Sequence, residues 1–398
     1  MLLAGEAETR NVTSAVGLLT YMILESLIVL GSIWLIGECC IVSLWIIVDT
    51  RTKKRIFPPY TPLVSVIVPC KGTGYGFHEN IPAFLTQEYP RYQTLFVVDS
   101  KDDPAYSAVD QLTKDKPNAH LALTNPVSGC SGKVAALLTG LASTADAEVL
   151  VFADSDMKPD AHWLQNLVAP LQDETIGATT GYRWYFPTDW KTSVFSVWNM
   201  ISIVCLFYPS PAWVWGGSTA IRKNVFEKLH IKEKWKTAIS DDCVVTAAVK
   251  KAKYTIYFQP KCIMESPPEE SIRGFARWGK RQFTWLRWHH PVLWLGAFFG
   301  FVGAVVIALG LLLLLLFGYY IPGILLSSLI LFEILCGWLG IHTLPKSMVY
   351  PKERYSSKIG YALMAPLAFL LVAQNVTASA ITQEIHWAGR SYRKRKNC

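Results

Sequence analysis

Charged residues are scarce in this chain: Asp, Glu, Lys and Arg make up 17% of its 398 residues, and hydrophobic residues make up 51%. A soluble globular domain usually carries about 25% charged residues. The deficit excludes a fully water-exposed surface of ordinary composition. It predicts that part of the protein surface is buried in lipid.

The nine cysteines lack any pattern: no two of them form a C-x-x-C pair, and their spacing is irregular. A disulfide framework or a zinc site would require such a pattern. We therefore interpret most of these cysteines as small apolar residues in a reducing compartment.

A nucleic-acid-binding motif is also missing, although the formal net charge is +8. The basic residues gather instead at 51–55 and 390–396, beside apolar runs. Basic residues in such places stay on the cytosolic side and attract anionic lipid headgroups. The charge therefore indicates a membrane partner rather than a nucleic acid.

The N-terminal part of the chain predicts one membrane anchor. An apolar run over 16–48 follows a short N-terminal segment, 1–15. Because about 20 apolar residues cross a bilayer, we expect one tilted transmembrane helix with an interfacial end. The basic, proline-containing linker 49–62 comes next, and its basic residues place the following domain in the cytosol.

Residues 63–290 are predicted to form a cytosolic α/β domain with interfacial helices. Apolar, β-rich segments alternate with helix-like ones, which predicts a parallel sheet; strands are expected at 63–68, 95–98 and 149–153, and helices at 80–89 and 133–141. Ligands bind at the carboxyl ends of such strands. Asp99, Asp154 and Asp156 fall at these ends.

Two apolar regions leave alternatives open. Residues 189–215 are rich in aromatic side chains but are broken by Pro209 and Pro211, so they form either an interfacial helix or a buried core segment. The C-terminal region 291–383 holds span candidates at 292–317, 321–341 and 359–381, followed by a basic tail, 384–398. Three crossings would place that tail outside, whereas its charge predicts the inside. We therefore expect the last candidate not to cross fully.

Two acidic pairs predict chemistry. Asp154-x-Asp156 directly follows a buried strand, and paired carboxylates bind a hard divalent cation. Asp241 and Asp242 precede a helix-like segment, 244–250. Asp242 is either a general base or a cap of that helix.

Two further segments combine features of a ligand site. Residues 213–222 contain a glycine pair that allows close backbone approach, or they form a simple turn into a strand. Residues 273–278, Arg-Gly-Phe-Ala-Arg-Trp, bring cations and an indole together before the membrane. They bind a diphosphate or form an interfacial aromatic belt.

In this order, the motifs resemble those of a family-2-type membrane glycosyltransferase, and most of all the ceramide glucosyltransferase branch, glycosyltransferase family 21. The matching motifs are the opening strand and Lys-Gly turn at 64–72, Asp99 with Asp-Asp-Pro-Ala at 102–105, the Gly132-Lys133 step, Asp154-x-Asp156, Asp241-Asp242, Arg277-Trp278, and Trp-Ala-Gly-Arg-Ser-Tyr-Arg at 387–393. The resemblance covers nearly the whole chain.

The resemblance implies a Rossmann-like GT-A domain, joined to transmembrane helices, that inverts a sugar, here glucose, as it moves it from a UDP-sugar to a ceramide- or glycerolipid-like membrane acceptor. It implies Mg²⁺ or Mn²⁺ at Asp154 and Asp156, and Asp242 as the catalytic base. It also implies that the acceptor lipid enters along 189–215. The implied donor contacts are Lys71, Asp99, Lys133, Asp154, Arg277 and Trp278.

Two departures from the family pattern matter. Gly274 stands where the family has Gln or Arg, and the incomplete motif argues against a processive polysaccharide synthase of the cellulose or hyaluronan type. One extra residue before 102–105 leaves both Asp99 and Asp102 open as the uracil contact.

Several alternatives stay open beside this interpretation. They are the processive synthase, a polyprenyl-phosphate glycosyltransferase and a non-catalytic membrane scaffold, the last disfavoured by the four carboxylates. We expect an integral, multi-pass membrane protein with a cytosolic catalytic domain. Its compact loops favour a prokaryotic cell membrane over an ER or Golgi membrane.

Overall fold

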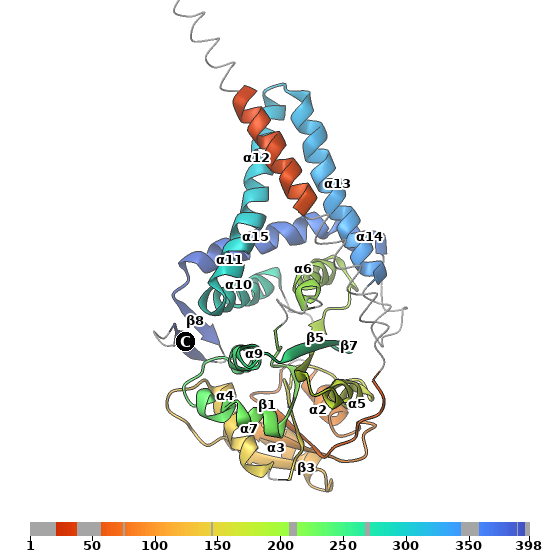
Figure 1. Ribbon diagram of the computed structural model, residues 1–398, viewed down its shortest axis with the longest axis vertical. Coiled ribbons are helices and arrows are strands. Elements are labelled where there is room, and N and C mark those ends of the chain that lie inside the picture. Colours follow the sequence, from red (N-terminus) through yellow and green to blue (C-terminus); the bar gives the residue numbers. More distant parts are fainter. Residues whose placement is uncertain are drawn as a thin grey trace, which may run out of the picture.

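The computed structural model describes residues 21–37, 57–74, 76–144, 146–206, 213–266, 271–343, 358–387 and 389–394. A sheet domain lies at one end of the molecule and a group of long helices extends from the other (Figure 1). The predicted linker up to residue 56, and the predicted first span at 16–20 and 38–48, lie outside the described residues.

The sheet domain contains a seven-stranded sheet with the order β3-β2-β1-β4-β6-β5-β7. The strands are β1 (Val64–Cys70), β2 (Tyr92–Val98), β3 (Ala119–Leu123), β4 (Val149–Ala153), β5 (Ile176–Trp184), β6 (Ser218–Arg222) and β7 (Thr255–Glu265). Strand β6 is antiparallel to both of its neighbours, and every other pair is parallel. The three strands expected from the sequence are confirmed as β1, β2 and β4.

Both faces of the sheet are buried, which explains the nearly continuous apolar character of its central strands. Successive side chains of β1 alternate between two cores, with Val66 and Val68 in one and Ile67 in the other. The first core is covered by α2 (Phe77–Ala83), α3 (Pro104–Thr113) and α5 (Trp163–Val168), and the second by α4 (Gly132–Gly140), α7 (Lys223–Lys228), α8 (Ile231–Trp235) and α9 (Asp241–Lys251), with 3₁₀ turns η1 (Leu141–Ser143) and η2 (Ala169–Gln172) alongside.

The helix expected at 80–89 is wrong in its bounds, because α2 ends at Ala83. The side chain of Gln87 donates to the carbonyl of Ala83 at 2.8 Å. The backbone amide of Gln87, which would have made that bond in a longer helix, donates to the Tyr92 hydroxyl instead. A side chain thus replaces the next helical hydrogen bond and stops the helix.

A helical layer covers the sheet domain on the side of the long helices. It contains α6 (Trp190–Leu206), α10 (Ile272–His289), α14 (Lys358–Leu363) and α15 (Ala365–Ile381). Phe195 on α6 stacks on Phe275 of α10 with ring centroids 4.0 Å apart. Gly279 lets α10 approach α15 closely, because an added Cβ would lie 1.7 Å from the Asn375 side-chain oxygen. Of the two interpretations of 189–215, the buried one holds for α6, and residues 207–212 lie outside the described residues.

Three long helices extend away from this layer. They are Tyr21–Gly37, α12 (Gly303–Leu316), which continues α11 (Pro291–Ala297) and the π-helical turn η3 (Phe298–Val302), and α13 (Tyr320–Thr343). By length and composition, Pro291–Leu316, Tyr320–His342 and Lys358–Ile381 are each long and apolar enough to cross a membrane. The apolar window of the last is 44% buried, against 17% in each of the other two. In Figure 1, α15 lies across the base of α12 and α13 rather than alongside them, as expected for a segment that does not cross fully.

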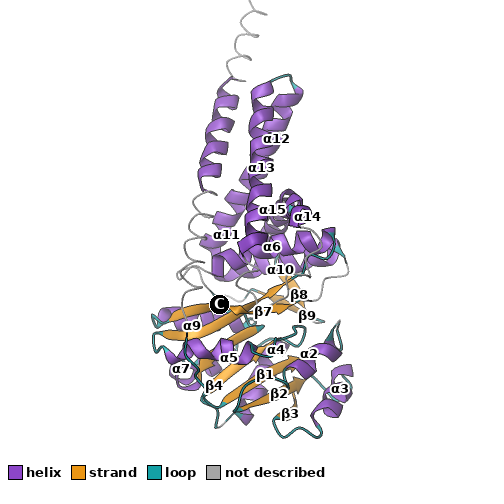
Figure 2. Cartoon of the chain, turned by 90° about the vertical axis from the view of Figure 1, so that its right-hand side faces the viewer, coloured by secondary structure: helices purple, strands orange, loops and turns teal. Residues whose placement is uncertain are grey.

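The predicted basic tail is folded at its start, which corrects the expectation of a plain tail. Residues 384–393 form an antiparallel hairpin of β8 (Glu384–Trp387) and β9 (Arg390–Arg393). Gly389, with φ of +74°, supplies the left-handed turn residue. The hairpin lies beside the sheet domain (Figure 2).

Candidate active site

A cavity of about 480 Å³ lies between the carboxyl ends of the sheet strands and the helical layer. Its walls come from the sheet domain, from α6, from α10 and the start of α11, and from the C-terminal hairpin. The acidic residues Asp99, Asp154, Asp156, Asp241 and Asp242 all line it. The sheet therefore brings together acidic motifs that are far apart in the sequence, as expected for the carboxyl edge of parallel strands.

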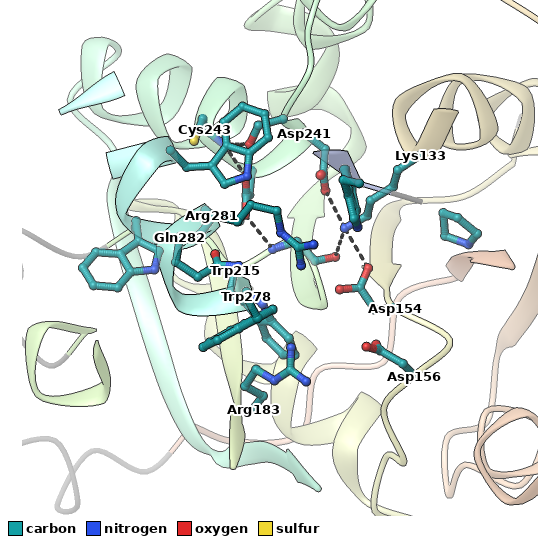
Figure 3. A pocket seen from close by; sticks show the side chains of 18 of the residues that line it. Lys133, Asp154, Asp156, Arg183, Trp215, Asp241, Cys243, Trp278, Arg281 and Gln282 are labelled. Atoms are coloured by element: carbon teal, nitrogen blue, oxygen red, sulfur yellow. Dashed lines mark hydrogen bonds and ion pairs between the residues drawn. The ribbon is translucent and has the colours of Figure 1, made fainter. Parts of the chain in front are cut away.

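Lys133 lies at the centre of the acidic wall (Figure 3). Ser131 caps α4 by accepting from the Val134 amide, and Lys133 projects from the first turn of this helix. Its ammonium lies 2.7 Å from Asp154 Oδ1 and 3.3 Å from Asp241 Oδ2. It also donates to the Gly216 carbonyl at 3.3 Å.

Electrostatics hold this ammonium in its charged form. Burial alone would lower the pKa of Lys133, but the carboxylates of Asp154 and Asp241 outweigh it and raise the pKa above the ordinary lysine value. Breaking a buried pair by removing one partner costs about 3–5 kcal/mol. Lys133 is therefore a fixed positive charge beside the predicted metal ligands.

Asp154 and Asp156 follow β4 as predicted, and both face the cavity (Figure 3). Enclosure by the protein raises the pKa of Asp156, and the like charge of Asp154 adds to this, whereas Arg183 and Lys133 oppose it. A cation between the two carboxylates would relieve their repulsion. Among the described residues, no group of three or more His, Cys, Asp or Glu side chains is arranged for a metal, so a cation here would need ligand oxygens from a bound molecule.

The Asp241-Asp242 pair begins α9. The helix cap is Ser240, which accepts from the Cys243 amide at 3.3 Å. Asp242 Oδ1 accepts from the same amide at 2.8 Å and from the Ser240 hydroxyl, and its Oδ2 accepts from the Gly216 amide at 3.4 Å. Asp242 thus assists the cap and also lines the cavity.

Asp241 differs from its neighbour in burial. Its side chain is 8% exposed and faces Lys133. Burial raises the pKa of Asp241 to about 6, where Asp242 adds to the rise and Lys133 opposes it.

The donor contacts implied by the resemblance fall into two groups. Lys71, Asp99, Lys133, Asp154 and Trp278 line the cavity. Lys71 Nζ lies 2.9 Å from Asp99 Oδ2. Of the two aspartates left open as the uracil contact, only Asp99 is among the lining residues.

Arg277 is not among the residues that line the cavity, although its neighbour Trp278 is. On α10 the lining residues Trp278, Arg281, Gln282 and Trp285 follow the helical repeat. A donor contact from Arg277 stays a prediction.

Arg183 is a cavity residue that the sequence analysis missed. Its guanidinium lies 5.1 Å from the Trp278 ring centroid and 5.2 Å from that of Tyr185, and its Nε donates to Ser266 at 3.0 Å. Burial lowers the pKa of Arg183, but Tyr185 and Asp156 outweigh this and raise it. The signal was weak because Arg183 ends β5, whose Gly-Ala-Thr-Thr-Gly run lacks a strongly apolar strand pattern.

The comparisons with known proteins agree with this geometry. A family model described as glycosyl transferase family 21 matches residues 29–398. Ceramide glucosyltransferases 1 and 3 of Caenorhabditis elegans are 36% and 39% identical over 69 and 62 residues. These stretches cover 17% and 16% of this chain, and only 15% and 14% of the relatives.

A solved structure shares the fold. It is a mannosyltransferase from Pyrobaculum calidifontis in complex with GDP-Man and Mn²⁺, which is 21% identical with a TM-score of 0.50. The match covers 88% of this chain and 98% of that one. At this identity the likeness shows the GT-A type of fold.

Proposed function

We propose a specific reaction for this chain, starting from the fact that it belongs to glycosyl transferase family 21 and is therefore a glycosyltransferase. The reaction is transfer of a sugar, glucose in the first instance, from a UDP-sugar to a membrane lipid of the ceramide or glycerolipid type, with inversion at the anomeric carbon. The short matches to ceramide glucosyltransferases support the choice of sugar and acceptor. The catalytic domain is proposed to face the cytosol.

The observation that carries this proposal is the composition of the cavity wall. The same cavity is lined by Asp154 and Asp242 and by Leu286 and Leu293. Leu293 lies in the first turn of Pro291–Leu316, a candidate membrane span. An acceptor with a polar hydroxyl head and an apolar chain fits such a wall, since its head reaches the carboxylates while its chain stays beside membrane helices. In this proposal the lipid enters past α6 and α10.

The protein groups divide the work of the transfer. Asp242 accepts the proton of the acceptor hydroxyl as it attacks the anomeric carbon. Lys133 is held by Asp154 and Asp241, so that its charge is already in place for the diphosphate leaving group. Trp278, packed against Arg183, offers an aromatic face to the sugar or the acceptor.

Asp154 and Asp156 suit a Mg²⁺ or Mn²⁺ ion that also binds the diphosphate. Two carboxylates beside each other supply hard oxygen ligands, and phosphate oxygens complete the set. When bound, such an ion neutralises charge on the leaving diphosphate. The mannosyltransferase with the same type of fold was solved with Mn²⁺ and GDP-Man.

The test is transfer by the purified full-length protein in detergent. It is given radiolabelled UDP-glucose with ceramide, diacylglycerol or polyprenyl phosphate, and the lipids are separated by chromatography. We expect one sugar on ceramide or diacylglycerol. A sugar on polyprenyl phosphate, or a polymer of many sugars, would replace the proposal with one of the two alternatives.

A further inference from the structure

We propose that the C-terminal hairpin β8–β9 is part of the nucleotide site and that Arg390 binds the diphosphate of the donor. This inference rests on the proposed function, because it specifies how the same cavity holds a nucleoside diphosphate. The hairpin follows the last membrane-proximal helix, yet Trp387, Arg390 and Tyr392 line the cavity.

Contacts place the hairpin against the first turn of α4. Arg390 Nη2 lies 3.4 Å from Asp99 Oδ1, across a separation of 291 residues. The backbone amide of Gly132 donates to the Tyr392 hydroxyl at 3.5 Å, across 260 residues. A Cβ added to Gly132 would lie 2.5 Å from Arg390 Nη1. The guanidinium therefore lies directly over the first residue of α4.

The hairpin is a built element. Arg393 pairs with Glu384 across its two strands at 3.0 Å, and Ile385 is 3% exposed. Arg281 of α10 lies 5.6 Å from the Trp387 ring centroid. These contacts hold Arg390 in position against the cavity.

The charges at this edge favour an anion. Lys71 and Arg390 both pair with Asp99, so two positive charges share one carboxylate. The first turn of α4 lies below them, and a helix N-terminus favours negative charge. Arginine binds phosphate through two parallel N–H donors. Asp154 and Asp156, the proposed metal ligands, line the same cavity, so a diphosphate there would lie between the metal and Arg390.

Arg393 provides a matched control on the same strand. Its side chain is 79% exposed, against 46% for Arg390, and its partner is Glu384. Replacing Arg393 removes one positive charge and one hairpin contact but leaves the cavity wall unchanged. Exposed ion pairs of this kind contribute little to stability.

The experiment is calorimetric titration of the full-length protein in detergent with UDP and with UMP, in the presence of Mn²⁺. We expect Arg390→Gln to weaken UDP binding by roughly ten- to a hundredfold, as for loss of a charge-assisted hydrogen bond, and to weaken UMP binding much less. Arg393→Gln is expected to bind UDP as the wild type does. Gly132→Ala displaces the Arg390 guanidinium, so it should weaken UDP binding and add little in the double variant.

The outcomes separate this inference from the proposed function. If wild-type protein binds no UDP, the proposed donor is wrong and the inference falls with it. If the wild type binds UDP and Arg390→Gln binds it equally, only the role of Arg390 is refuted, as for an arginine that binds a lipid headgroup. Equal losses in Arg390→Gln and Arg393→Gln, or equal losses for UDP and UMP, would also overturn it. Melting temperatures of all variants verify folding.

Discussion

Replacing Asp242 by asparagine separates its two roles. Asp242 Oδ1 accepts from the Cys243 amide at 2.8 Å, and an asparagine oxygen can make the same bond. Ser240 also caps this helix. A cap contributes about 1 kcal/mol, and Asp242→Asn should retain most of it. The melting temperature is therefore expected to change little.

The rate is expected to fall sharply, because asparagine cannot take up the acceptor proton. A general base contributes about a hundred- to ten-thousandfold, or about 3–5 kcal/mol in activation free energy. The assay is single-turnover transfer from radiolabelled UDP-glucose to ceramide, with UDP affinity measured separately and expected to be nearly unchanged. Ser271→Ala is the matched control for lost capping, since Ser271 caps α10 by accepting from the Gly274 amide at 3.1 Å.

Asp241→Asn is expected to behave differently from Asp242→Asn. Asp241 lies 3.3 Å from Lys133, so its replacement should change donor affinity as well as rate. If Asp242→Asn keeps more than about a tenth of wild-type kcat, an effect of ~1.4 kcal/mol, then Asp242 is not the base. Asp241 would then be the next residue to test.

Three further predictions concern the metal, the topology and the pH dependence. Asp156→Ala should fold but lose turnover, and EDTA should inactivate the wild type; activity that persists in EDTA would contradict a metal-dependent transfer. A reporter fused to the C-terminus and a cysteine introduced at Asp102 should both be found on the cytosolic side, because Arg390 contacts Asp99; opposite sides would refute the even number of crossings between them. The raised pKa of Asp241, about 6 against an ordinary 3.9, means that the folded state binds this proton more tightly than the unfolded state, so stability falls as pH rises through 6. In metal-free buffer Asp241→Asn should therefore melt above the wild type at pH 7.5 and level with it at pH 5, and a pH-independent difference would exclude this assignment.

The central strands and the acidic motifs could be predicted because their signals are local. Residues 149–153 form β4 with the expected bounds, since a short continuous apolar run between polar residues suits a strand buried on both faces. The Asp154-x-Asp156 motif was found by its place after that run. Strand β5 was missed because its middle carries threonine and glycine, and Arg183 at its end was missed with it.

The sequence by itself determined the class of the protein: a GT-A glycosyltransferase with apolar helices, recognised from motifs in a given order and from runs of apolar residues. Those signals act over a few residues, so the chain's local preferences are enough to reveal them. Only the tertiary structure decided which charges meet. Lys133 faces Asp241 as well as Asp154, Arg183 packs on Trp278, and Arg390 returns across 291 residues to Asp99. Such contacts depend on how strands, helices and the hairpin pack in space, which no local pattern encodes.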